Sequence, residues 1–68
     1  MNYYRVEYTY LIEESTTERK REIEYAFGIN CQEAVNEVRW LNQELKELRV
    51  ERVWKDIHNS WWAVNAWN

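Results

Sequence analysis

The feature that most constrains the fold is the alternation of apolar and other side chains along residues 3–12. One parity of this segment is aromatic or aliphatic throughout, consisting of Tyr4, Val6, Tyr8, Tyr10 and Ile12. A period of two with aromatic and branched residues is typical of a β-strand that buries one of its faces. The segment therefore predicts a strand at the start of the chain.

A second alternating run covers residues 18–27 and follows a polar stretch at 13–17 that predicts a loop. Its apolar members lie at its far end, which an antiparallel hairpin places beside the start of the first strand. We therefore expect a hairpin in which Tyr25 and Phe27 lie near Tyr4 and Val6.

Residues 28–48 predict a helix. Asn30 is a favourable N-cap, and Glu33 three residues later completes an arrangement similar to a capping box. An apolar stripe at spacings of four and three then follows, made of Ala34, Val38, Leu41, Leu45 and Leu48. This stripe predicts an amphipathic helix from about 31 to 48 that lies across one face of the sheet.

The last twenty residues return to strand chemistry, with branched and aromatic runs at 50–55 and 61–64. The turn formers at 56–60 lie between them, and Asn59 is the residue best able to adopt a positive φ. The element order is thus ββαββ, which predicts an α+β fold: one amphipathic helix packed on a four-stranded, mostly antiparallel sheet, as a single domain over 1–68. The order of the strands and the facing of the second hairpin stay open.

Composition narrows the class of protein. The 68 residues carry a formal net charge of -3, and the single cysteine excludes an intrachain disulfide framework. No apolar run approaches the roughly 20 residues of a membrane span, and the N-terminus lacks a secretory apolar region. Taking the chain as complete from its Met, we expect a cytoplasmic protein with no membrane association.

Catalytic chemistry has few candidates in this sequence. Asp56, His58 and Ser60 are the residue types of a hydrolytic triad, but one short turn offers neither a pocket nor an oxyanion hole. Cys31 begins the helix, where a reactive thiol and a small packed residue are both possible, and the core stripe beside it favours the packed role. A metal pair of Cys31 and His58 would need further ligands. We therefore expect no enzyme, no catalytic residue, no metal and no cofactor.

The outer face of the predicted helix suggests a binding surface. Trp40 falls about 200° round from Val38 at roughly 100° per residue, on the same side as four glutamates. These glutamates are Glu33, Glu37, Glu44 and Glu47. An exposed tryptophan in an acidic ring would suit a protein partner with a basic surface. The alternative is that Trp40 folds back over the edge of the core.

The C-terminal hairpin suggests a second surface, because it is rich in tryptophan: Trp54, Trp61, Trp62 and Trp67. Adjacent residues of a strand point to opposite faces, so one of Trp61 and Trp62 must lie away from the helix. An uncovered face with a tryptophan, and with Leu11 or Tyr3, favours self-association as a homodimer. Residues 49–68 hold three cations and two anions, whereas residues 1–48 hold six cations and ten anions. Single-stranded nucleic acid on the aromatic hairpin is a further alternative, which the acidic balance of the chain disfavours.

In being very small, acidic, aromatic-rich and without catalytic residues, the chain resembles small proteins encoded by phages and other mobile elements. Anti-CRISPR inhibitors of host defence are among those proteins, and they mask basic nucleic-acid-binding surfaces. The resemblance implies a non-enzymatic protein-binding inhibitor. It rests on type alone, because no residue motif identifies one family, and it assigns no site residue.

Overall fold

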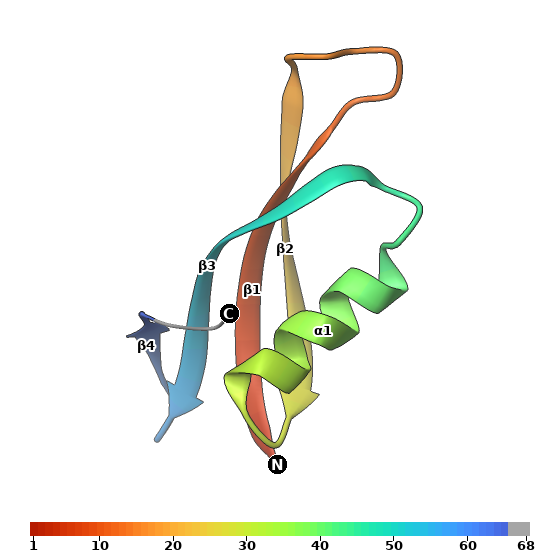
Figure 1. Ribbon diagram of the computed structural model, residues 1–68. Coiled ribbons are helices and arrows are strands. Elements are labelled where there is room, and N and C mark those ends of the chain that lie inside the picture. The colour runs from red at the N-terminus through yellow and green to blue at the C-terminus, as the bar shows by residue number, and fades with distance from the viewer. Residues whose placement is uncertain (66–68) are drawn as a thin grey trace.

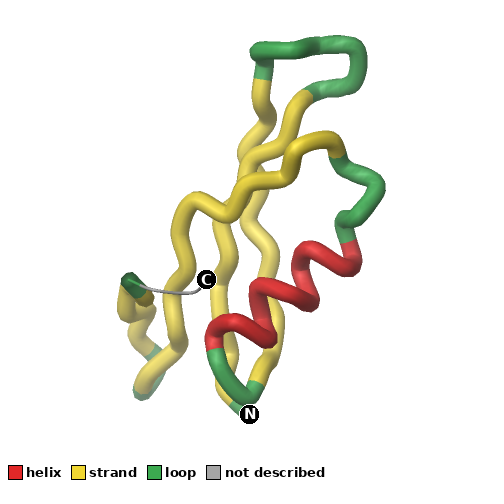
Figure 2. Tube along the Cα trace, in the orientation of Figure 1, coloured by secondary structure: helices red, strands yellow, loops and turns green. Residues whose placement is uncertain are grey.

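A computed structural model describes residues 1–65 of the chain. Its elements are β1 (Asn2–Leu11), β2 (Arg19–Gly28), α1 (Cys31–Leu41), β3 (Lys46–Ile57) and β4 (Ser60–Val64). The strands form one antiparallel sheet in the order β2-β1-β3-β4, with α1 on one face (Figures 1 and 2). The predicted α+β fold and its ββαββ order are confirmed. β1 lies inside the sheet, whereas β2 and β4 form its two edges.

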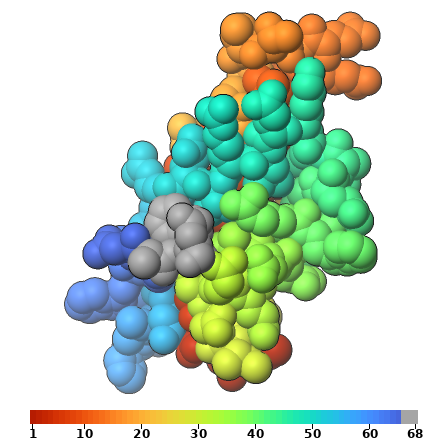
Figure 3. Space-filling view, in the orientation of Figure 1, coloured from red at the N-terminus to blue at the C-terminus, as the bar shows by residue number. Residues whose placement is uncertain are grey.

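The core lies between α1 and one face of the sheet. It is built from valine, alanine and tyrosine side chains: Tyr4, Val6, Tyr8, Ala26, Ala34, Val35, Val38 and Val53. The helix begins as expected, because Asn30 Oδ1 accepts the Glu33 N–H at 2.9 Å and Glu33 Oε1 accepts the Ile29 N–H at 3.0 Å. In the space-filling view α1 covers its side of the sheet next to β3 (Figure 3).

As predicted, the first hairpin brings Tyr25 and Phe27 beside the start of β1, but they do not share a face of the sheet with Tyr4 and Val6. Directly paired residues share a face of the sheet, and the register pairs Tyr4 with Ala26 and Tyr3 with Phe27. Tyr25 and Phe27 therefore lie on the face away from the helix. The reason is the close approach of α1 to β2. A Cβ atom on Gly28 would lie 2.8 Å from the backbone nitrogen of Ala34, so this half of β2 has room only for small residues under the helix.

The helix also ends earlier than predicted, at Leu41 rather than Leu48. Asn42 closes it, since its backbone N–H donates to the carbonyls of Arg39 and Val38, and its side-chain amide donates to Val38 O at 2.8 Å. Leu45 and Leu48 are half-buried and pack against the core from the turn and from β3. At Leu45 and Leu48 the stripe thus marked burial correctly, but it combined residues of two kinds of element. Leu41, the remaining leucine of the stripe, is exposed.

The second hairpin closes through a two-residue turn, His58-Asn59, in which both residues have positive φ (51° and 64°). A turn with two positive φ angles matches the twist of the flanking strands. The register then settles the facing that the sequence left open. Trp54 pairs with Ala63 and Trp61 with Asp56, so these four lie on the face away from α1, whereas Trp62 lies on the helix side. The only helix of the described residues is too short and too polar to cross a membrane.

Candidate functional site

The face of the sheet opposite α1 is not covered by any element of residues 1–65. We call it the open face. Its residues follow from the register and, for Glu51 at the bulge of β3, from its hydrogen bond with Thr9: Tyr3, Arg5, Glu7, Thr9 and Leu11 of β1, Arg19, Arg21, Ile23, Tyr25 and Phe27 of β2, Lys46, Arg49, Glu51, Arg52, Trp54 and Asp56 of β3, and Trp61 and Ala63 of β4. The expectation that a tryptophan, with Leu11 or Tyr3, lies on an uncovered face is confirmed, since Tyr3 and Leu11 both share this face with Trp54 and Trp61.

One end of the open face is an aromatic cluster, which we define as Tyr3, Tyr25, Phe27, Trp54 and Trp61. The Tyr3 ring lies 4.6 Å from Phe27, 5.8 Å from Tyr25 and 5.9 Å from Trp61, between ring centroids. Tyr25 lies 5.8 Å from Trp61 in turn. Phe27 is 60% exposed and Trp61 37% exposed, so water reaches the rings. Each such pair contributes roughly 0.5–1.5 kcal/mol beyond burial, which makes the cluster a firm surface rather than a set of loose side chains.

Arg5 joins Trp54 to the other rings of this cluster. Its guanidinium carbon lies 4.1 Å from the Trp54 ring centroid and 5.1 Å from that of Trp61. Cation–π contacts of this kind contribute about 1–2 kcal/mol when partly shielded from water. The Nε atom of Arg5 is buried and has no hydrogen-bond partner among the described residues. The aromatic cluster therefore holds the Arg5 guanidinium in place, and the Nε–H of this group has no acceptor among the described residues.

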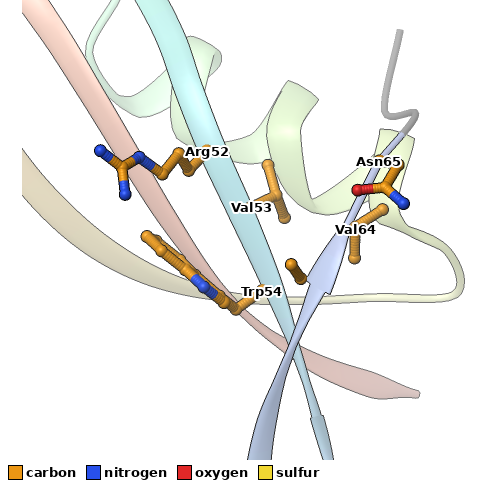
Figure 4. A pocket seen from close by; sticks show the side chains of 6 residues that line it. Arg52, Val53, Trp54, Val64 and Asn65 are labelled. Carbon is orange, nitrogen blue, oxygen red and sulfur yellow. The ribbon is translucent and has the colours of Figure 1, made fainter.

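A row of arginines continues from the cluster along the open face. Glu7 is only 8% exposed and pairs with Arg21 and with Arg52, whose Nε lies 3.5 Å from Glu7 Oε2. Arg19 donates to the hydroxyl of Thr9 at 3.0 Å. One buried carboxylate thus orients two arginines, while more than half of the Arg21 and Arg52 side chains stays exposed. In the close-up, Arg52 and Trp54 project from the same side of β3, and Val53 and Val64 lie on the other (Figure 4).

The fold separates the charges of the chain. Five of its six arginines, namely Arg5, Arg19, Arg21, Arg49 and Arg52, lie on the open face, together with three acidic residues, Glu7, Glu51 and Asp56. Glutamates dominate elsewhere. A chain of net charge -3 therefore presents an aromatic face with a local excess of positive charge.

On the helix side, Glu24 is part of a small polar network. The Tyr8 hydroxyl donates to Glu24 Oε1 at 3.1 Å, and the side-chain amide of Asn42 donates to the same oxygen at 3.0 Å. Burial of Tyr8, followed by the charge of Glu24, raises the pKa of this phenol to about 12. The network connects the end of α1 to β1 and β2 through Glu24, and we assign it a role in holding the helix on the sheet.

The predicted acidic surface around Trp40 is only partly assembled. Trp40 is exposed, at 66%, so it does not fold back over the core. Glu33 and Glu37 are exposed on α1 with it, but the helix ends at Leu41. Glu44 therefore lies in the following turn, and Glu47 lies in β3. The four glutamates do not form one helical ring, because two of them are not on the helix.

The predicted self-association set is divided between the two faces. Trp54 and Trp61 belong to the aromatic cluster, whereas Trp62 is 59% exposed on the helix side, beside Lys55. Trp67 lies outside the described residues. Sequence reasoning missed Arg5, Tyr25 and Phe27 as surface residues. The sequence did contain a sign of this. Arg19 and Arg21 alternate in step with Tyr25 and Phe27, so all four share one face of β2, and two arginines on a face indicate that it is exposed to solvent.

The candidates for catalysis are placed apart from any enclosed site. Asp56, His58 and Ser60 lie at the tip of the β3–β4 hairpin, and no hydrogen bond joins their side chains. Cys31 is half-buried against the core, and burial raises the pKa of its thiol, which favours the packed role over a reactive one. Within residues 1–65, no group of three or more His, Cys, Asp or Glu side chains is placed to hold a metal ion.

Comparison with known proteins adds no family to this description. No protein-family model matches the chain, and no curated protein or solved structure matches it either. The functional argument therefore rests on the surfaces of the molecule itself.

Proposed function

We propose that the protein is a non-enzymatic binding module that holds single-stranded nucleic acid on its open face. The observation that carries the proposal is that five aromatic rings and five arginines share this one face. Bases of a single strand stack on aromatic side chains, and each such contact is worth roughly 1–3 kcal/mol. Arginine binds phosphate through a planar set of donors that fits the anion. The face supplies both kinds of contact side by side.

The acidic net charge of the chain does not oppose this function. A polyanion responds to the field at the surface that it approaches, and the fold moves most glutamates away from the open face. A duplex hides the faces of its bases, so it gains phosphate contacts but no stacking. We therefore expect preference for single strands over duplexes.

A second copy of the chain is a less suitable occupant of the open face. Pairing of two open faces would bring five arginines of each copy toward those of the other, and like charges across an interface cost free energy. Nucleic acid compensates the same arginines. This difference favours nucleic acid over the homodimer as the partner of the aromatic cluster.

Two adjacent tryptophans provide a matched test. Trp61 lies in the aromatic cluster, and Trp62, the next residue, lies on the helix side. Binding of a fluorescent twelve-nucleotide single strand is measured by anisotropy for Trp61→Ala and Trp62→Ala. Loss of one stacked base predicts a weakening of about ten-fold for Trp61→Ala, since about 1.4 kcal/mol is ten-fold in affinity. Trp62→Ala should stay within about two-fold of the unmodified protein.

Three outcomes contradict the proposal. The first is equal binding by both variants, provided that circular dichroism shows each to be folded. The second is a duplex of the same length that binds as tightly as the single strand. The third is light scattering that reports a dimer which Trp61→Ala dissociates, since a second copy would then occupy the face.

A further inference from the structure

The outer edge of β2 carries no strand in the described part of the chain, because β2 pairs with β1 alone. An edge strand presents the N–H and C=O groups of alternate residues to whatever lies beside it. β2 is ten residues long, which is enough to pair with another extended segment. Charged side chains occur along β2 as far as Glu24, whereas its last four residues, Tyr25 to Gly28, are uncharged.

A hollow of about 510 Å³ lies at this uncharged end of β2, and we call it the edge groove. Its lining comes from β2, α1 and the N-terminus: Tyr25, Ala26, Phe27, Glu33, Glu37, Leu41 and Met1. Tyr25 and Phe27 belong to the open face, whereas Ala26 belongs to the helix side. Because residues of both faces line the same hollow, the groove follows the edge of β2 rather than either face of the sheet.

The edge groove is apolar with one acidic wall. Met1, Phe27 and Leu41 are all more than half exposed, so the apolar part is open to solvent. Glu33 and Glu37 lie one helical turn apart on α1 and supply the acidic wall. Glu33 is engaged through Oε1 with the Ile29 N–H, but Glu37 has no hydrogen bond or ion pair within residues 1–65. None of the lining side chains is basic, and the α-amino group of Met1 forms no ion pair within residues 1–65.

We propose that the edge groove binds an extended segment of a partner protein by strand addition to β2, with a lysine or arginine of that segment against Glu33 and Glu37. Strand addition obtains affinity from the backbone of the edge and specificity from alternate side chains. A lysine or arginine suits this groove because its aliphatic stem packs on apolar surface while its charge reaches a carboxylate. The edge groove shares Tyr25 and Phe27 with the open face but lies at the edge of the sheet, and the inference does not depend on nucleic-acid binding.

The charge of the groove selects a foreign segment over a second copy of the chain. Antiparallel pairing of two β2 edges through residues 24–28 would bring Glu24 of each copy into the shared edge. Both α1 helices would then lie on the same side of the joined sheet, so that Glu33 and Glu37 of the two copies approach each other. Like charges oppose that arrangement, whereas a basic segment relieves it.

The sequence predicted that a partner with a basic surface contacts the outer face of the helix around Trp40. The proposed contact site for a basic partner is instead the edge groove. Trp40 is exposed on α1 but does not line the edge groove, whereas Glu33 and Glu37 do. Of the five residues predicted to contact a partner, these two are the ones that the groove brings together with apolar surface and the unpaired edge of β2. Glu44 is exposed outside the groove and serves as a matched acidic control.

The test uses the full chain labelled with ¹⁵N and two blocked heptapeptides, one of alternating valine and lysine and one with glutamate in place of lysine. We expect the lysine peptide to shift the amide resonances of residues 24–28 and 33–41 and to slow amide exchange at alternate positions of β2. Glu37→Lys should weaken binding of the lysine peptide by about ten-fold and strengthen binding of the glutamate peptide. Glu44→Lys should change neither by more than about two-fold.

Several results overturn this inference. Equal binding of the two peptides removes the acidic wall from recognition, and shifts confined to β4 and to the part of β3 around Trp54 place the peptide elsewhere. Shifts of residues 24–28 that depend on protein concentration without peptide identify a second copy as the occupant. Trp61→Ala, which should weaken nucleic-acid binding, should leave the lysine peptide bound, so failure of either proposal is read independently of the other.

Discussion

Three arginines of the open face hold most of their side chains in solvent, and they make the salt dependence of nucleic-acid binding a quantitative test. These are Arg21, Arg49 and Arg52. Arg5 is stacked on two tryptophans, and Arg19 donates to Thr9 and to the carbonyl of Glu47. We therefore count three arginines as available to phosphates. The perturbation is Arg52→Gln, which removes one of them and leaves Arg21 paired with Glu7.

The magnitude follows from counterion release. For a single strand, the logarithm of the binding constant falls against the logarithm of salt with a slope of about -0.7 for each phosphate neutralised. Three arginines give a slope of about -2, or a loss of affinity of roughly twenty-fold between 50 and 200 mM salt. Two arginines give about -1.4, or roughly seven-fold over the same range.

The assay is the fluorescence anisotropy of the labelled single strand at four salt concentrations. Arg39→Gln is the control, because it changes the net charge of the protein by the same amount as Arg52→Gln. Arg39 lies on α1, away from the open face, and its removal should leave the slope near -2. Equal slopes for the two variants would refute the assignment of phosphate contacts to the open face. A slope near zero in the unmodified protein would refute electrostatic binding altogether.

Two further predictions concern stability. The raised pKa of Tyr8 means that the unfolded chain loses this proton first as the pH rises above 10, so the unfolded state then binds fewer protons. Stability should therefore fall by roughly 1.4 kcal/mol for each unit between pH 10 and about 12, and urea unfolding at pH 8 and pH 11 should show less of this loss for Tyr8→Phe. Gly28→Ala should lower the free energy of unfolding by about 1–3 kcal/mol, because its Cβ would meet backbone atoms of α1 at 2.8 Å. An unchanged urea midpoint for Gly28→Ala would contradict the close contact between β2 and α1.

Local patterns predicted the elements well because each pattern reports on neighbours in sequence. The alternation of residues 3–12 predicted β1, the Asn30 cap predicted the start of α1, and Asn59 predicted the turn of the second hairpin. Propensity and capping act over a few residues, so a single sequence is sufficient to recognise them.

The end of the helix was predicted seven residues too late for a related reason. Leu45 and Leu48 continue the spacing of an amphipathic helix, and both are half-buried against the core. Burial alone does not distinguish a helix that continues from a chain that turns and returns as a strand. Asn42 decides between them, because its backbone and side chain both bond to carbonyls of the last turn.

The candidate sites were predicted in part. The sequence indicated that Trp40 lies on the outer face of the helix and that one of Trp61 and Trp62 lies away from it; Trp40 is indeed exposed, and Trp61 is the one on the open face. It also marked Glu33 and Glu37 as a surface for a basic partner, which stays a prediction. The inhibitor role suggested by the resemblance to small phage proteins is likewise a prediction that nothing here tests.

The sequence by itself determined the kind and order of the elements, the start of the helix, and which residues of β1 and of β2 share a face of their strand. Only the tertiary structure decided which parity of β2 faces the helix, since that depends on a register shared with β1 and on the room left by Gly28 and Ala26. Side chains alternate with a period of two, so that one decision moved Arg19, Arg21, Tyr25 and Phe27 together to the open face. The candidate binding surface exists because the strands pair in this register, and no single segment of the chain encodes it.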